Sequence, residues 1–253
     1  MNTILVIAKN TFRQTIRDKI LYGIFTFGLL FIGSTVILGS LALEDNIFII
    51  RNLGLAGIYI FSLIITIFLA SSLIYSEVEN RTTYILLAKP VARSSIIIGK
   101  FLGLLLAIAT TTLLMTLAYI IIVVTNGGGI DYSALAAVGI QMFEMALLIA
   151  IIILFSIFTT PLGSIIYTIL IVYIGHSLSF MLLYAERSGN LARSVLYSIY
   201  YLFPNLEKFN IRNLVVHNIS VSSQDTLIVT IYAITYTVFL IYLAQSLFNR
   251  KDL

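Results

Sequence analysis

Residues whose types and spacing could support chemistry are few, and the closest grouping is Glu77, Glu79 and Arg81, which alternate along one short segment. Paired carboxylates can bind a metal ion or exchange protons with a substrate. Intramembrane peptidases built on paired glutamates need adjacent glutamates and histidines on later spans, which this sequence lacks. It contains no HExxH, no GxSxG and no cysteine, and 2 histidines are too few for a common zinc site. We therefore expect no catalytic residue and no metal site.

Glu144 and His176 stand inside long apolar runs, where an ionised side chain is costly unless it is paired, protonated or hydrated. One interpretation makes these residues part of a polar substrate path or a proton relay. The other is a polar contact between helices or subunits, in which Glu144 bonds to Ser, Thr or Tyr on a neighbour. We favour the contact, because one acid and one histidine without regular spacing make a poor relay.

The composition indicates which environment must position these residues. Of the 253 residues, 60% are hydrophobic and 10% are charged, and the mean hydropathy is +1.05. A soluble domain carries about 25% charged residues, so the bilayer must be the solvent of this protein. The net charge of +4 is concentrated near the ends of the apolar runs, which predicts membrane lipids rather than nucleic acid as partners. No cleavable signal pattern is visible, so we expect the first span to be an uncleaved anchor.

Six apolar runs are long enough to cross a bilayer, which takes about 20 residues each. They cover residues 20–43, 53–75, 101–125, 134–159, 162–183 and 226–248. The fourth and fifth runs form one hydrophobic block, which we divide at Pro161 and Gly163 because proline removes a backbone donor and glycine loosens the chain. The sequence thus predicts an all-α polytopic membrane protein, with residues 1–253 as a single domain.

Residues 2–19 precede the first span and show helical spacing on two faces. Lys9, Arg13 and Arg17 form a basic row, while Phe12 belongs to an apolar row with the same spacing of four. This pattern predicts an amphipathic helix that lies in the headgroup plane. The alternative is a first span that extends out of the bilayer with snorkelling basic side chains.

Lysine and arginine residues near the span ends predict the orientation. Placing the N-terminus inside gathers most of these residues on the cytoplasmic side, so we expect both termini in the cytoplasm. The outer loop of residues 184–225 is then too long for a simple turn. Its aromatic and aliphatic residues stand at helical spacing before Pro204, which predicts one or two short helices at, or dipping into, the outer interface.

The cytoplasmic loop of residues 76–100 is the most charge-dense segment between two long apolar runs. A helix starting near Ser76 would have acids in its first turn, which favours its dipole, and an apolar patch that needs cover. Pro90 ends that helix. Such a surface below the membrane suits docking of another protein, although an ordinary solvated loop fits these residues equally well. The candidate contact residues are Glu77, Glu79, Arg81, Tyr84, Leu87, Pro90 and Arg93.

The same loop resembles the segment after the second span in type-2 ABC exporter permeases. The similarity rests on the acidic pair, a leucine-rich turn, Lys89-Pro90-Val91-x-Arg93 and then Gly99-Lys100. Alanine at position 92 departs from the Ser or Thr common in that family. The basic N-terminal helix, the six spans and the long outer loop also match the family plan, so the resemblance covers most of the chain. Residues 202–209, LFPNLEKF, are similar to a stretch in its nitrous-oxide-maturation and gliding-type branch.

The resemblance implies a permease subunit for ATP-driven export across the bacterial cytoplasmic (inner) membrane. The subunit would form a dimer with a second copy or a paralogue and would bind a separate ABC ATPase subunit, which holds ATP and Mg. Because the chain lacks a Walker loop, we expect it to bind no cofactor itself. Residues 76–87 would sit in a groove on the ATPase, with Glu77, Glu79 and Arg81 making polar contacts. The residues indicate neither the substrate nor a choice between homodimer and heterodimer.

Two other functions stay open at this point. The first is an ATP-independent membrane protein, either a secondary transporter or a scaffold for envelope components. One buried acid and no visible inverted repeat argue against an ion-coupled carrier. The second is an ABC machine that transports nothing and instead exerts force on a periplasmic partner through residues 184–225.

Overall fold

The computed structural model describes residues 3–41, 46–79, 93–187, 189–217, 219 and 222–250. Within these residues every regular element is helical, and six helices are long and apolar enough to cross a membrane. The predicted all-α fold class is therefore confirmed. The elements are α1 (Thr3–Ile16), α2 (Lys19–Ser40), α3 (Asn46–Glu79), α5 (Arg93–Thr125), α6 (Tyr132–Ser156), α7 (Pro161–Arg187), α8 (Asn190–Leu202), the 3-10 helix η1 (Leu206–Phe209), α9 (Arg212–Val216) and α10 (Ser223–Arg250).

Two of the spanning helices are longer than their apolar runs. Helix α3 has 34 residues and α5 has 33, so each is about 50 Å long at 1.5 Å per residue. The hydrocarbon core of a bilayer is about 30 Å thick. The predicted spans 53–75 and 101–125 lie within these helices. They are shorter than the helices because helical turns with polar residues do not extend the apolar pattern on which the prediction rests. Both helices are therefore longer than a crossing along the bilayer normal requires.

The division between α6 and α7 follows from Pro161. Helix α6 ends at Ser156 and α7 begins at Pro161, where a missing N–H costs nothing because first-turn amides have no partner within the helix. The hydroxyl of Thr160 accepts a hydrogen bond from the Gly163 amide at 3.3 Å. The chain thus turns back between these helices, where the hydrophobic block is continuous in sequence.

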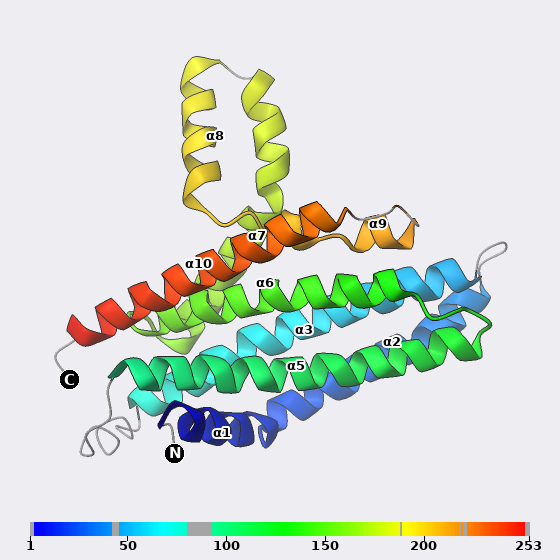
Figure 1. The fold of residues 1–253 in the computed structure, drawn as a ribbon, viewed down its shortest axis with the longest axis horizontal. Helices are drawn as coiled ribbons and strands as arrows, with labels where there is room; N and C mark the ends of the chain where they lie inside the picture. The colour runs from blue at the N-terminus through cyan, green and yellow to red at the C-terminus, as the bar shows by residue number, and fades with distance from the viewer. Residues whose placement is uncertain are drawn as a thin grey trace.

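Helices α2, α3, α5, α6 and α10 run side by side along the long axis of the molecule (Figure 1). Helix α6 contacts α3, α5, α7 and α10, and more than half of the residues in its apolar window are buried. Met145, Leu147 and Leu148 on this helix are fully buried. The start of α1, the end of α3, the start of α5 and the end of α10 all lie at one end of the bundle (Figure 1).

Helix α1 lies alongside the beginning of α5 (Figure 1). A Cβ atom on Gly99 would lie 2.7 Å from Ile7, and one on Gly103 would lie 2.6 Å from the carbonyl oxygen of Ala8 and from Thr11. Two glycines four residues apart therefore let the helix backbones approach closely. In the structure α1 follows the beginning of α5 in the same direction, and its predicted place in the headgroup plane stays a prediction.

The chain between α7 and α10 forms a hairpin and then returns to the bundle. The last turns of α7 pair with α8 and stand off from the other helices (Figure 1). All 13 residues of α8 are described, and none is buried. By contrast, Leu206 and Phe209 of η1 are 0% and 2% exposed. Between α7 and α10 the chain thus contains an exposed helix, α8, and a short helix, η1, that packs into the bundle.

Candidate functional site

A cluster of polar side chains lies halfway along the spanning helices. Tyr59, Glu144 and His176 stand near the middle of α3, α6 and α7, respectively. Glu144 is only 1% exposed. An ionisable group at this depth is expensive unless other polar groups satisfy it, so the contacts of this carboxylate define the site.

The imidazole of His176 connects two carboxylates. Its Nε2 atom lies 3.1 Å from Glu144 Oε1 and 2.7 Å from the Tyr59 hydroxyl, while its Nδ1 atom lies 3.0 Å from Glu207 Oε2. The Tyr59 hydroxyl also donates a hydrogen bond to Glu144 Oε1 at 2.9 Å. The second oxygen of Glu144 is buried and has no hydrogen-bond partner among the described residues. Four elements, α3, α6, α7 and η1, thus meet at one imidazole.

Residues 204–211 form the re-entrant segment, which brings Glu207 to this depth. Gly175 makes room for it, because a Cβ atom there would lie 2.7 Å from Leu206 Cγ and 2.8 Å from the Pro204 carbonyl oxygen. The Asn205 amide donates to the Tyr232 hydroxyl of α10 at 2.9 Å. The segment is therefore fastened to both α7 and α10.

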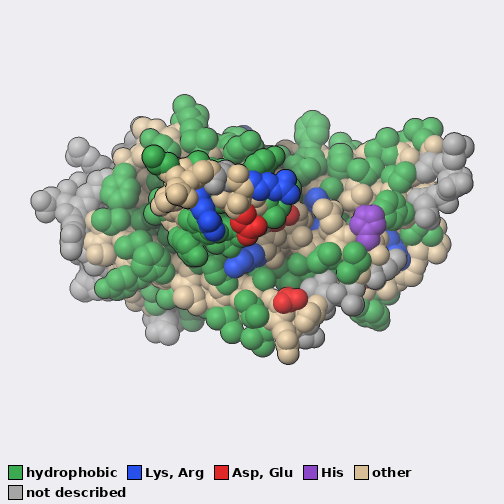
Figure 2. All heavy atoms as spheres, turned by 90° about the horizontal axis from the view of Figure 1, so that it is seen from above, with side chains coloured by type: hydrophobic (Ala, Val, Ile, Leu, Met, Phe, Trp, Pro, Cys, Tyr) green, Lys and Arg blue, Asp and Glu red, His purple; other side chains and the backbone are tan. Residues whose placement is uncertain are grey.

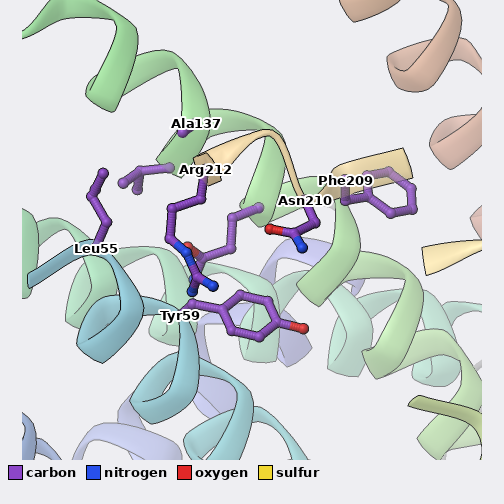
Figure 3. A pocket seen from close by; sticks show the side chains of 8 residues that line it. Leu55, Tyr59, Ala137, Phe209, Asn210 and Arg212 are labelled. Carbon is purple, nitrogen blue, oxygen red and sulfur yellow. The ribbon is translucent and has the colours of Figure 1, made fainter. Parts of the chain in front are cut away.

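Two further polar side chains from this part of the chain face the cluster. The amide of Asn210 donates to Glu207 Oε1 at 3.0 Å, and the Arg212 guanidinium lies 5.7 Å from the centre of the Tyr59 ring. Figure 3 shows Arg212 and Asn210 pointing toward Tyr59 from the other side of a small pocket. A guanidinium at this distance from an aromatic face is attracted by the ring.

An open groove of about 670 Å³ borders the cluster. One side is apolar and aromatic and comes from α3 and α7, and the other side carries charged and amide groups from the re-entrant segment and α9. This arrangement can bind a molecule with both apolar and polar parts. The described residues contain no group of three or more His, Cys, Asp or Glu side chains that could hold a metal ion. The groove is lined by Tyr59, Leu63, Ile169, Val172, Tyr173, His176, Ser177, Phe180, Glu207, Asn210 and Arg212.

Only some of the residues that the sequence proposes for ATPase coupling belong to the described part of the chain. The backbones of Glu77 and Glu79 belong to the last turns of α3, and Arg93 is the first residue of α5. The remaining candidates fall outside the described residues; they are Arg81, Tyr84, Leu87 and Pro90. Their predicted role in docking stays a prediction.

The basic residues predicted at the N-terminus are exposed. Lys9 and Arg13 lie on the surface of α1, and Arg17 follows this helix with its side chain also exposed. Phe12 is half-buried, and the face that packs on α5 contains Ala8, Thr11 and Thr15. The basic row is therefore free of the packing that holds α1 to the bundle.

The sequence pattern indicated Glu144 and His176 separately but not their partners Tyr59 and Glu207, nor Arg212, which lies over the Tyr59 ring. Tyr59 is one of 15 tyrosines and gives no signal by itself. Glu207 does give a signal, because it is a single acid between the apolar residues Leu206 and Phe209. It also belongs to the stretch LFPNLEKF, which resembles a segment of a known family. Its contact with His176 depends on the re-entrant path, which spacing alone does not reveal.

Comparison with known proteins gives one family. The family model described as ABC-2 family transporter protein matches residues 5–253. No curated protein matches the chain at a significant level. The family match extends over α1, all six spanning helices and the re-entrant segment. This chain therefore belongs to the ABC-2 family of transporter proteins and is a membrane subunit of the ABC permease type.

Proposed function

We propose that this chain exports a substrate across the bacterial cytoplasmic membrane with energy from ATP hydrolysed by a separate ABC ATPase subunit. The observation that carries the proposal is the groove beside Tyr59, His176 and Glu207, which offers polar groups halfway along the spanning helices of an ABC-2 family chain. Because the sequence has no Walker loop, ATP and Mg belong to the partner and this chain binds no cofactor.

The groove is part of a larger path that two permease chains enclose. The exposed apolar faces of the spanning helices meet lipid or a second subunit, which is another copy or a paralogue. Both termini are cytoplasmic in this proposal. The distribution of Lys and Arg residues supports this orientation, as does the position of the start of α1 and the end of α10 at one end of the bundle (Figure 1).

Helix α3 can transmit force from the ATPase to the groove. It runs without a break from Tyr59 to Glu79, a distance of about 30 Å along the helix axis. A push on the end that carries Glu77 and Glu79 therefore displaces the wall of the groove that carries Tyr59. Helix α5 begins at the same end and carries α1 along its side, so both helices move together.

Charge reversal at the end of α3 tests this assignment. The double variant Glu77→Lys/Glu79→Lys should lose assembly with the ATPase from the same cell, or lose stimulated ATP hydrolysis, in reconstituted vesicles. Asp225→Lys is the matched control, because Asp225 is exposed in the first turn of α10, far along the chain from this loop. Wild-type assembly and hydrolysis in the double variant would exclude the docking role.

A second candidate function is force exerted on a periplasmic partner without transport. The hairpin of α7 and α8 favours it, because Glu186, Arg187 and Arg193 are exposed there. Figure 2 looks down on this side of the molecule and shows side chains of both charges close together among hydrophobic and other side chains. Transport measured in vesicles that contain only the permease and its ATPase distinguishes the two functions, since a force-generating machine would hydrolyse ATP there without moving a substrate.

A further inference from the structure

Both ring nitrogens of His176 contact oxygen atoms, and these contacts call for a proton at each. A neutral imidazole has only one such proton, and two ionised carboxylates supply none. A neutral imidazole donates through one nitrogen and accepts through the other. Here the Tyr59 hydroxyl donates to Glu144, so Nε2 needs a proton to bond to the oxygens at 2.7 and 3.1 Å. Nδ1 faces Glu207 Oε2 at 3.0 Å, and this contact needs a second proton.

We propose that Glu144, His176 and Glu207 form a binding site for one proton, and that this proton fastens the re-entrant segment to the bundle. The proton lies on the imidazole or on one of the two carboxyl groups, and in each case all three contacts become hydrogen bonds. The proposal rests on these contacts and does not depend on the ATPase or on a transported substrate.

The charges around His176 agree with this proton count. Tyr59 of α3 and Glu144 of α6 face Nε2, and Glu207 of η1 faces Nδ1. Arg212 of α9 lies over the Tyr59 ring. From α7 itself, Tyr173 borders the same groove, and from η1 the Lys208 ammonium lies 4.8 Å from the Tyr232 ring centre on α10.

Within the cluster itself, two carboxylates and one guanidinium leave one negative charge. The extra proton brings this sum to zero. A neutral cluster at this depth avoids most of the cost of burying charge.

A neutral imidazole keeps one N–H, and where Nε2 holds it for Tyr59 and Glu144, loss of the proton converts the contact with Glu207 from attraction to repulsion. The lone pair of Nδ1 then faces a carboxylate oxygen at 3.0 Å. Glu207 also holds Asn210, and both side chains border the groove together with Arg212. Release of Glu207 therefore loosens residues 204–211 and changes the wall of the groove, so proton binding and the shape of the groove are coupled.

Hydrogen–deuterium exchange of the full chain in lipid nanodiscs, measured from pH 5 to 9, tests the proposal. After correction for intrinsic exchange rates, amides of residues 205–211 should exchange about tenfold faster above the transition, the effect of losing one charge-assisted hydrogen bond. Exchange in α5 should not change, which reports that the bundle is intact. A wild-type chain without this step in residues 205–211 would overturn the proposal.

Two variants separate this proton from other titrating groups. In Glu207→Gln the carboxamide donates to Nδ1 of a neutral imidazole, so the segment should stay protected at every pH. In His176→Gln no imidazole can take up the proton, so exchange should no longer change with pH. Persistence of the wild-type step in either variant contradicts the assignment. His217→Gln is the matched control, because His217 lies against Phe48 instead, and it should keep the wild-type step.

Discussion

Removing the hydroxyl of Tyr59 gives the sharpest test of the polar cluster. In Tyr59→Phe, Glu144 Oε1 loses a donor at 2.9 Å and keeps only the contact with His176. Glu144 is 1% exposed and its other oxygen already has no partner among the described residues. Water cannot easily replace the lost donor, so we expect the full loss to appear in stability.

The size of the effect depends on whether Glu144 is ionised. Hydrogen bonds to charged groups contribute about 1.5–3 kcal/mol, whereas side-chain hydrogen bonds between membrane helices average about 0.6 kcal/mol. The value that follows is the one expected for an ionised acceptor. At about 2–4 °C per kcal/mol for a chain of this size, Tyr59→Phe should lower the apparent Tm by about 3–12 °C.

The measurement is a double-mutant cycle with Tyr59→Phe and Glu144→Gln, followed by thermal unfolding in one detergent at one scan rate. The carboxamide that Glu144→Gln introduces can still accept the tyrosine proton, so the cycle isolates the part of the bond that depends on charge. We expect a coupling of about 1–2 kcal/mol, the difference between a charged and a neutral acceptor. Tyr242→Phe is the control, since this side chain is 68% exposed. A coupling under about 0.5 kcal/mol would contradict the expected dependence of this hydrogen bond on a charged acceptor.

Two further predictions concern the ends of the bundle. Gly103→Leu should push α1 off α5 at a cost of about 1–3 kcal/mol and lengthen the distance between spin labels at Leu5→Cys and Leu106→Cys, in a chain without native cysteines. Gly33→Leu should leave this distance unchanged, because no atom lies within 4 Å of a Cβ atom there, and an unchanged distance in Gly103→Leu would contradict the packing. Asp131→Ala should lower thermal stability by about 1 kcal/mol, because the carboxylate accepts from the first-turn amides of α6. Asp131→Asn keeps this cap and should lose much less, since the ion pair with Arg51 is long at 3.8 Å; equal losses would assign the effect to the ion pair.

Much of the fold could be predicted because one physical cause determines it. Each spanning segment must pair its backbone polar groups within a helix and expose apolar side chains to lipid over a fixed thickness. This requirement produces a continuous apolar run in the sequence. Pro161 likewise marked the division between α6 and α7, since proline starts a helix easily but cannot continue one. The ends of the helices were harder to predict. Helix α3 continues to Glu79 because polar residues also form helical turns, and hydropathy gives no signal for such turns.

The candidate site was only partly predictable because its contacts join distant parts of the chain. Glu144 and His176 were visible as polar residues in apolar runs, yet Tyr59 lies 117 residues before His176 and Glu207 lies 31 residues after it. The close packing of the re-entrant segment against Gly175 determines which side chains meet. Nothing in the sequence distinguishes this glycine from the other 14 as a packing contact. Tertiary packing, rather than local pattern, therefore assembles this cluster.

The re-entrant path of residues 204–211 also affects how the protein is made. Glu207 follows His176 by 31 residues, so during synthesis α7 leaves the ribosome before the re-entrant segment does. Tyr59 and Glu144 can already satisfy one nitrogen of His176, but the other has no native partner until the segment folds back. The segment is itself held by Tyr232 of α10, the last helix of the described chain. A chain truncated before residue 204 therefore leaves Nδ1 of His176 without its native partner inside an apolar environment.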